Sequence, residues 1–189
     1  MKHAVLYQAA SLCLSYPDDE FRARLPLLRQ AAPQLRDFLD FADATDPTEL
    51  AAHYVKVFDF KNRHSLYLSW WRDGDTRRRG MTLVGFKQVY REHGLEFSDE
   101  ELPDFLPAVL EFSAQVDARL LLEFRPGLEL LRLALTDHGT PYASVLDAVC
   151  RTLPGPSPKD KAAAMAMAKC GPPIETVGLE PFTLVGEPS

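Results

Sequence analysis

Long apolar segments are missing from this chain of 189 residues. A helix that spans a membrane needs roughly 18 or more consecutive apolar residues, and no stretch of the sequence approaches that length. The first twenty residues also lack a signal-peptide cleavage pattern, because Gln8, Ser11 and Ser15 interrupt their apolar positions. We therefore expect a cytoplasmic protein that does not insert into a membrane.

Cysteine is scarce, and its spacing matches no known framework. Cys13, Cys150 and Cys170 are odd in number and far apart, which excludes a set of disulfides and a CxxC metal site. The five histidines show no HxxxH spacing and no cysteine neighbour. The motifs GxSxG, GxxxxGK[ST] and GxGxxG are also absent. We therefore expect no catalytic residues, no metal ligands and no cofactor, and hence a protein that is not an enzyme.

Positive charge is in deficit, with 21 Lys and Arg against 27 Asp and Glu and a net charge of -6. Such a balance repels phosphate backbones and argues against nucleic acid as a partner. Hydrophobic residues make up 46% of the chain and charged residues 25%, as in an ordinary globular protein. The length suits one domain, because domains usually run to roughly 100 to 200 residues.

Apolar residues recur at helical spacing along most of the chain, whereas no comparable run alternates with a period of two. The four clearest stripes are Val5-Ala9-Leu12-Tyr16, Leu50-Tyr54-Val57-Phe58, Leu102-Phe105-Val109-Phe112-Val116 and Tyr142-Val145-Leu146-Val149-Leu153. This pattern predicts an all-α fold, a single-domain bundle of seven to nine helices.

Several residues indicate where these helices begin. Asp46-Pro47-Thr48-Glu49 offers an N-cap followed by a proline suited to the first turn, and residues 98–101 read as a capping box. Pro107 predicts a kink or a restart, because proline cannot donate within a helix interior. A helical domain over 1–153 is expected, followed over 154–189 by a proline-rich linker, a short alanine-rich helix and an extended Pro/Gly-rich arm.

The stretch from His64 to Gly80, HSLYLSWWRDGDTRRRG, packs aromatic, acidic and basic residues together without any catalytic spacing. This mixture favours binding over chemistry, because aromatic rings supply contact area and charges orient a partner. Two interpretations stay open. The aromatic residues can belong to the core or to a groove, and the arginines can contact a partner or form a solvated helix start paired with Asp73, Asp75 and Glu92.

Three segments together resemble the delta-type assembly chaperones of respiratory nitrate reductase, the NarJ family. They are HYVKVFDFKNRHSLYLSWWRDGDTRRRG at 53–80, ELPDFLPAVLEF at 101–112 and VGLEPF at 177–182. The resemblance extends over most of the chain, from LYQAASLCLSYPDDEF at 6–21 onward. One position departs from the pattern: the wider group of redox-enzyme maturation proteins often has histidine directly after the aspartate of its acidic-proline turn, and this chain has Phe105.

The resemblance implies an all-helical, non-catalytic cytoplasmic chaperone. Its partner would be the N-terminal segment of the apo form of the nitrate reductase catalytic (alpha) subunit. The chaperone would support molybdenum cofactor insertion before membrane docking, with cofactor delivery proteins as further partners. By motif, Tyr54 and Phe58 match the family's aromatic helix. The GDxRxRG turn is matched by Asp75, Arg79 and Gly80, and the acidic-proline turn by Glu101, Pro103 and Asp104.

These residues define a predicted peptide-binding site. We expect an apolar channel lined by Tyr54, Phe58, Tyr67 and Leu68, with Glu101 and Asp104 at its rim, that receives an amphipathic helix. Asp75 is expected to cap the helix that follows it, with Arg79 and Gly80 completing the turn.

Three alternatives remain from sequence alone. The client could be another molybdoenzyme of the same superfamily. The chain could be a helical regulator that binds nucleic acid through Arg72 and residues 77–79. It could also be a cofactor-transfer enzyme that uses one of its cysteines.

Overall fold

The computed structural model describes residues 3–59, 62–98 and 101–170, and nearly all of its regular structure is helical. The helices are α1 (Ala4–Leu14), α2 (Asp19–Ala31), α3 (Arg36–Ala44), α4 (Pro47–Phe58), α5 (Trp70–Asp73), α6 (Arg77–Glu92), α7 (Leu106–Gln115), α8 (Arg119–Glu123), α9 (Arg125–His138), α10 (Tyr142–Cys150) and α11 (Lys161–Cys170), with 3₁₀ turns at Pro33–Leu35 and Asn62–His64. The all-α prediction is confirmed. The eleven α-helices in these ranges exceed the expected seven to nine, because α5 and α8 are too short for a 3.6-residue period to reveal.

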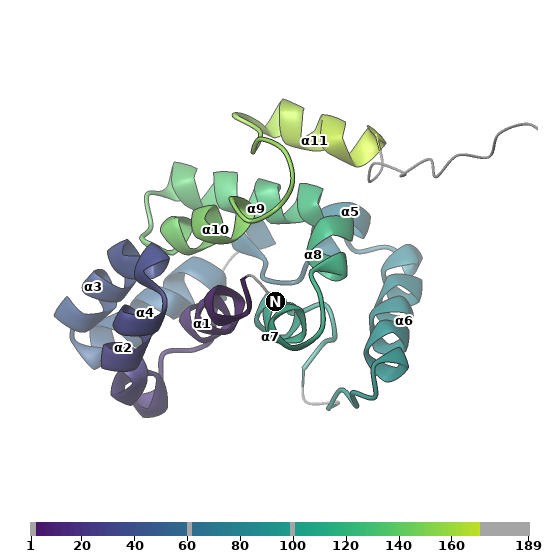
Figure 1. The fold of residues 1–189 in the computed structure, drawn as a ribbon. Helices are drawn as coiled ribbons and strands as arrows, with labels where there is room; N and C mark the ends of the chain where they lie inside the picture. The colour runs from purple at the N-terminus through teal and green to yellow at the C-terminus, as the bar shows by residue number, and fades with distance from the viewer. Residues whose placement is uncertain (1–2, 60–61, 99–100, 171–189) are drawn as a thin grey trace, which may run out of the picture.

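Helix α1 lies at the centre of the bundle, beside α7 and against α10 (Figure 1). Seven of its eleven residues are buried, since it has neighbours on several sides. Ser11 shows how closely α1 and α7 approach: its Oγ donates a buried hydrogen bond of 2.8 Å to the carbonyl oxygen of Pro107. An aromatic cluster continues the core toward α3 and α4, where the rings of Phe38 and Tyr142 lie 4.6 Å apart between centroids.

Local start signals were predicted with mixed success. Asp46 caps α4 as expected, because its Oδ1 accepts hydrogen bonds from the amides of Thr48 and Glu49. Pro107 marks a restart, since α7 begins at Leu106 with the proline in its first turn. The predicted capping box over 98–101 falls partly on residues 99 and 100, outside the described part, and Glu101 lies in a bend before α7.

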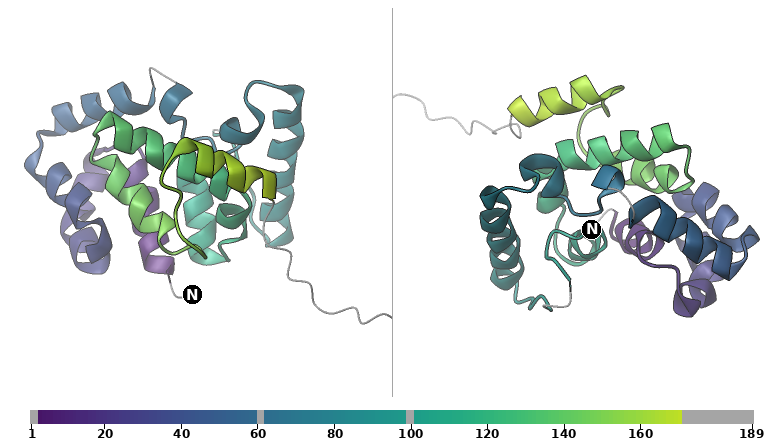
Figure 2. Two further views of the ribbon diagram at one scale, coloured as in Figure 1. Left: turned by 90° about the horizontal axis from the view of Figure 1, so that it is seen from above. Right: turned by 180° about the vertical axis from the view of Figure 1, so that it is seen from behind.

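The segment 154–158 was predicted to be a linker, and it is anchored to α9 by two arginines. Arg125 donates to the carbonyl oxygens of Pro154, Gly155 and Pro156, and Arg132 donates to that of Pro158 over 2.7 Å. Helix α11 then lies over α9 on the outside of the bundle (Figure 2), as the predicted alanine-rich helix. The predicted extended arm falls largely on residues 171–189, outside the described residues.

Candidate functional site

Two segments that precede helices run side by side at the predicted site. The Tyr67 loop (residues 65–69) leads into α5, and the Asp104 turn (residues 101–105) leads into α7. The amide of Leu68 donates to the carbonyl of Asp104 over 3.0 Å, and the amide of Leu106 donates to the carbonyl of Leu66 over 2.7 Å. Tyr67 and Phe105 thus form an antiparallel bridge, isolated from any strand. Backbone pairing therefore fixes how these two segments meet.

Asp104 is the buried centre of this pairing, with no exposed side-chain surface. Its Oδ2 accepts hydrogen bonds from Ser69, from Oγ over 2.5 Å and from the amide over 3.1 Å. Arg79 lies beside both, with Nε donating to Ser69 Oγ over 3.2 Å and Nη2 standing 3.8 Å from Asp104 Oδ2. The other carboxylate oxygen, Oδ1, is buried without a hydrogen-bond partner. Such an acceptor is costly unless a donor reaches it.

Tyr67 lies above this buried group and is partly exposed. Its hydroxyl donates to Glu101 Oε1 over 2.9 Å, while its ring packs on Phe105 at 5.5 Å between centroids. The Arg79 guanidinium lies 5.7 Å from the centre of the Tyr67 ring, within cation–π range. Burial, with the hydrogen bond to Glu101 as the next cause, raises the pKa of Tyr67 to about 12. The hydroxyl therefore remains a donor throughout the neutral range.

Three predicted channel residues lie in the core instead. Tyr54, Phe58 and Leu68 are only 6%, 9% and 1% exposed. The Tyr54 hydroxyl donates to the carbonyl of Leu14 over 3.2 Å, and the Phe58 ring lies 4.9 Å from that of Tyr142. The expectation that these side chains line an open channel is therefore wrong. The helical period of α4 places Tyr54 and Phe58 on one face, and that face packs against the bundle.

Asp75 also has a different place from the one predicted. Helix α6 begins after Thr76, whose backbone is extended and which makes no side-chain cap, and Asp75 is exposed. The carboxylate that organises this turn belongs to Asp73, which accepts from Thr82 Oγ1 over 2.7 Å while its carbonyl accepts from Thr76. The prediction that Asp75 caps α6 is wrong. The prediction that Gly80 permits close helix packing is wrong as well, because a Cβ built there meets nothing within 4 Å.

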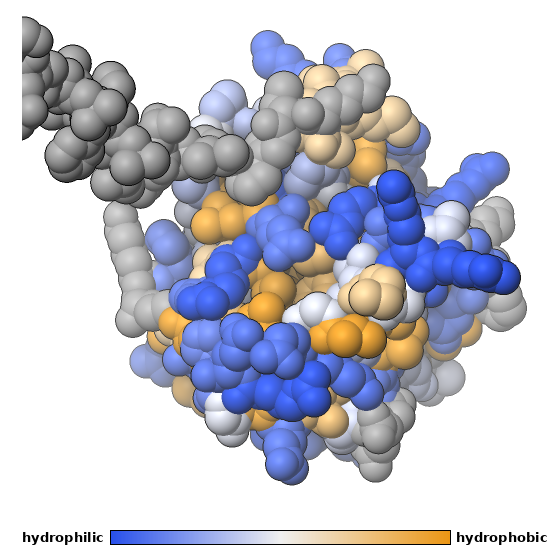
Figure 3. All heavy atoms as spheres, turned by 90° about the vertical axis from the view of Figure 1, so that its right-hand side faces the viewer, coloured by the Kyte–Doolittle hydropathy of each residue, from blue (hydrophilic) through white to orange (hydrophobic). Residues whose placement is uncertain are grey.

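The basic residues around this turn divide into two groups. Arg72 pairs with Asp73 and Glu123, and Arg79 lies beside Asp104, so both are held by carboxylates. Arg77 and Arg78 are exposed at the start of α6. The side of the molecule that carries α6 faces the viewer in Figure 3, where apolar surface lies between strongly hydrophilic residues. Met81 and Val84 on this helix are 74% and 55% exposed.

Sequence reasoning missed Ser69 and gave Trp71 no specific partner. Ser69 is fully buried and supplies both hydrogen bonds to Asp104. Trp71 donates from Nε1 to the carbonyl of Ser65 over 2.9 Å, and this bond ties α5 back to the Tyr67 loop. The only available signal was chemical: a buried aspartate requires donors, and a serine in the neighbouring motif can supply them.

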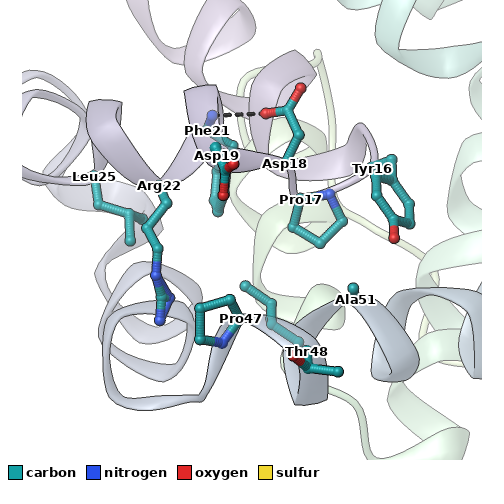
Figure 4. Close-up of a pocket in the computed structure, with 11 residues that line it drawn as sticks. Tyr16, Pro17, Asp18, Asp19, Phe21, Arg22, Leu25, Pro47, Thr48 and Ala51 are labelled. Carbon is teal, nitrogen blue, oxygen red and sulfur yellow. Dashed lines mark hydrogen bonds between the residues drawn. The ribbon is translucent and has the colours of Figure 1, made fainter.

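A hollow of about 370 Å³ lies elsewhere, between the α1–α2 connection, α2 and the start of α4 (Figure 4). Tyr16 stands at its edge, 54% exposed and edge-on to Tyr54 at 5.6 Å. Two polar side chains around the hollow have structural partners: Asp18 accepts from the amide of Phe21, and Arg22 donates to the carbonyl of Thr45. We assign no binding role to it.

Comparison with known proteins places the chain in a family. The sequence profile described as "Nitrate reductase delta subunit" matches residues 23–147. The chain belongs to the nitrate reductase delta subunit family. A Bacillus subtilis relative described as a probable nitrate reductase molybdenum cofactor assembly chaperone, NarJ, is 33% identical over 162 residues, which cover 79% of this chain and 88% of that protein. The resemblance to NarJ proteins is therefore confirmed.

Other members of the delta subunit family differ in length. Escherichia coli NarJ, also described as a nitrate reductase molybdenum cofactor assembly chaperone, is 32% identical over 72% of this chain and 64% of its own length. The nitrate reductase-like protein NarX of Mycobacterium tuberculosis is 39% identical over 78% of this chain, but the match spans only 24% of NarX. The chain therefore corresponds to about a quarter of that larger protein.

A solved structure supports the fold of the delta subunit family. It comes from Archaeoglobus fulgidus and is assigned as a candidate redox enzyme maturation protein. It superimposes with a TM-score of 0.67 over 80% of this chain and 94% of its own, at 21% identity. At that identity the likeness concerns the helical architecture.

Metal and thiol chemistry has little support among the residues that the structure describes. No group of three or more His, Cys, Asp and Glu side chains in those ranges could hold a metal ion. Burial raises the pKa of the Cys13 and Cys150 thiols, which keeps them protonated and poorly nucleophilic. None of the helices in the described ranges combines the length and apolar character that crossing a membrane requires.

Proposed function

We propose that this protein is an assembly chaperone that binds the N-terminal segment of the apo nitrate reductase alpha subunit. In this role it supports molybdenum cofactor insertion before the enzyme docks at the membrane. Family membership supports the proposal, because NarJ relatives that align over most of their length are described as cofactor assembly chaperones of nitrate reductase.

The observation that carries the site assignment is the arrangement of Tyr67, Glu101 and Arg79 over buried Asp104. A partly exposed aromatic ring is hydrogen-bonded to one carboxylate, and the segment that carries it pairs with the turn that holds another, buried one. Such a surface suits a helix with an apolar stripe and basic flanks, because the ring supplies contact area and Glu101 attracts positive charge. Of the eight predicted site residues, these four come together in space.

The remaining predicted residues take supporting or separate roles in this proposal. Tyr54, Phe58 and Leu68 are buried in the core, and they contact a client only through a rearrangement of it. Asp75 lies at the exposed start of α6, where it is free to contact a long client segment but contributes no cap. The contact surface is therefore centred on Tyr67.

The unpartnered Oδ1 of Asp104 supports the same assignment. A buried acceptor without a donor loses solvation without compensation, and a client donor or an ordered water that reaches it restores a hydrogen bond. A bound segment that carries a serine, arginine or lysine at this depth gains both a contact and selectivity.

The experiment is calorimetric titration of the full-length protein with a synthetic peptide from the N-terminus of the alpha subunit encoded with it. A peptide of the same composition in scrambled order is the control. We expect saturable binding of the native peptide and induction of helix in it, measured by circular dichroism. Absence of binding, together with failure to recover the apo alpha subunit from cells that express the nitrate reductase operon, would refute the proposal. Recovery of a different molybdoenzyme would reassign the client.

A further inference from the structure

A second apolar surface lies on the outside of the bundle, and part of this chain covers it. Leu130 and Leu133 of α9 form a small cluster with Trp71 of α5 and Ala164 of α11, separate from the main core. Ala164 is fully buried in this contact, and both leucines are less than 10% exposed. Helix α11 lies over α9 in the views of Figures 1 and 2. Without α11, the outer edge of both leucines would face solvent.

Helix α11 covers this surface with little apolar contact of its own. Ala164 is its only fully buried side chain among residues 161–168, while Ala162, Met165 and Ala166 are exposed. An alanine buries much less apolar area than a leucine or methionine, so the contact is weak. A helix of ten residues is also marginal when it stands alone. The docked position of α11 therefore rests on a small apolar contact.

The segment before α11 is held much more firmly. Arg125, Glu129 and Arg132 share one face of α9, and Glu129 is fully buried. Its Oε2 accepts from Arg132 Nε over 2.7 Å, and its Oε1 accepts from Ser157 Oγ over 2.7 Å. Glu129 thus helps to orient Arg125 and Arg132, which donate to backbone carbonyls of the segment 154–158. This anchor does not depend on α11, so the helix can leave the surface and stay attached to the bundle.

Trp71 connects this surface to the candidate site. Its side chain packs so closely on α9 that a Cβ at Gly127 would lie 2.9 Å from the Cβ of Trp71. Its Nε1 bonds to the carbonyl of Ser65, in the Tyr67 loop. Trp71 therefore links the surface under α11 to the Tyr67 loop.

We propose that the surface formed by Trp71, Leu130 and Leu133 is a helix-docking site, in which α11 is a weak resident that an amphipathic helix of the client displaces. The inference rests on the proposed function for the identity of that client. It extends the contact area from the Tyr67 loop around α5 to the outer face of α9.

The resident helix indicates the chemistry of the helix that replaces it. Lys161 lies 3.6 Å from Asp137 at the far end of α9, so a basic residue near the start of the incoming helix suits this end. A hollow of about 380 Å³, lined by Leu133, Asp137 and Ala162 among others, lies at this end of the contact. The fitting helix has a basic residue followed three positions later by an apolar residue, as Lys161 is followed by Ala164.

The first experiment tests the docking surface without any client. Ala164→Asp in the full-length protein should release α11, and Ala166→Asp is the matched control on the exposed side of the same helix. A fluorescent peptide of residues 160–170 with Cys170→Ser should bind the Ala164→Asp protein about tenfold or more tightly than it binds the control. Equal affinity for both proteins, or no binding to either, would overturn the docking surface.

The second experiment tests displacement by the client. The alpha-subunit peptide should bind the Ala164→Asp protein about fivefold or more tightly than the wild type, because no resident helix competes, and the Ala166→Asp protein should match the wild type. Unchanged or weaker affinity in the Ala164→Asp protein would overturn displacement while leaving the proposed function intact. A client peptide that binds none of the three proteins, together with failure to recover the apo alpha subunit from cells, would refute the proposed function, and the client assignment made here would fall with it. Concentration-dependent dimers of the Ala164→Asp protein that exclude the client peptide would show a second copy as the occupant, which also overturns the inference.

Discussion

The hydroxyl of Tyr67 donates a 2.9 Å hydrogen bond to Oε1 of Glu101, across 34 residues of sequence. This bond joins the Tyr67 loop to the Asp104 turn, and both side chains remain partly exposed. Tyr67 is therefore available to a partner while its orientation is fixed from both sides, by Glu101 at the hydroxyl and by Phe105 and Arg79 at the ring.

Truncation of Tyr67 should have a large effect on client binding. Tyr67→Ala removes a ring that is already oriented for contact, so the affinity for the alpha-subunit peptide should fall by about 2 kcal/mol or more. Tyr67→Phe keeps the ring and loses only the bond to Glu101, and its affinity should fall much less. Calorimetry with variants shown to be folded by circular dichroism measures both, and equal losses would place the important contact at the hydroxyl.

Glu101→Gln should change the salt dependence of binding more than the affinity at high salt. The amide oxygen can still accept from the Tyr67 hydroxyl, whereas the negative charge at the rim is lost. Association with a basic peptide should slow at low ionic strength and become less sensitive to added salt. Stopped-flow measurements at several salt concentrations would check this, and an unchanged salt slope would remove Glu101 from the contact surface.

Tyr67 should ionise late in an alkaline titration. Its pKa is raised to about 12 in the folded protein, above its ordinary value of 10, because burial and Glu101 disfavour the phenolate. A raised folded pKa means that the stabilising contribution is complete below about pH 10 and is lost as the pH rises toward 12. The difference in absorbance at 295 nm between the wild type and Tyr67→Phe should therefore show a midpoint near 12, and a midpoint near 10 would contradict this contact.

Asp46 and Asp75 should differ sharply when each is replaced by alanine. Asp46→Ala removes the cap of α4 and should lower the free energy of unfolding by about 0.5 to 2 kcal/mol. Asp75→Ala removes an exposed side chain without a cap and should change it by less than about 0.5 kcal/mol. Urea denaturation compares the two directly, and a large loss for Asp75→Ala would restore the capping role.

Glycines in α9 and α6 should respond in opposite directions. Gly127→Ala places a Cβ 2.9 Å from Trp71 Cβ and 3.2 Å from the carbonyl oxygen of Leu68, and it should destabilise the fold by about 1 to 3 kcal/mol. Gly85→Ala meets nothing within 4 Å and should stabilise α6 by about 0.5 to 1 kcal/mol. Thermal unfolding of both variants provides the comparison. A neutral Gly127→Ala would show that α5 moves easily relative to α9.

Local signals in the sequence predicted local structure, whereas burial depended on contacts between distant segments. The cap at Asp46 follows from four adjacent residues, and the sequence identified it. Whether Tyr54 faces a core or a groove depends on Leu14 and Tyr142, far away in the chain, and periodicity cannot distinguish the two. Before α6, both Asp73 and Asp75 are close enough in sequence to organise the turn. Asp73 does so, because it accepts a hydrogen bond from Thr82.

The site was predicted in part for the same reason. The family resemblance located Arg79, Glu101 and Asp104, the aromatic stretch supplied Tyr67, and the structure brings these four together. The resemblance could not supply Ser69, which matters because Asp104 is buried and its Oδ2 accepts its hydrogen bonds from Ser69. The anchoring of 154–158 was equally hidden, because proline and glycine indicate a turn or linker but not which arginines bind its carbonyls.

The pairing of Leu68 with Asp104 also has a consequence for how the protein acquires its activity. The two halves of the site are about 35 residues apart in the sequence. Bringing them together costs loop-closure entropy before their contacts contribute any stability. Helices α5 and α6 lie between the halves and must fold back before the halves can meet. A newly made or partly unfolded chain therefore lacks the proposed client surface, and binding competence should appear in a refolding experiment only with the last, slowest recovery of native structure.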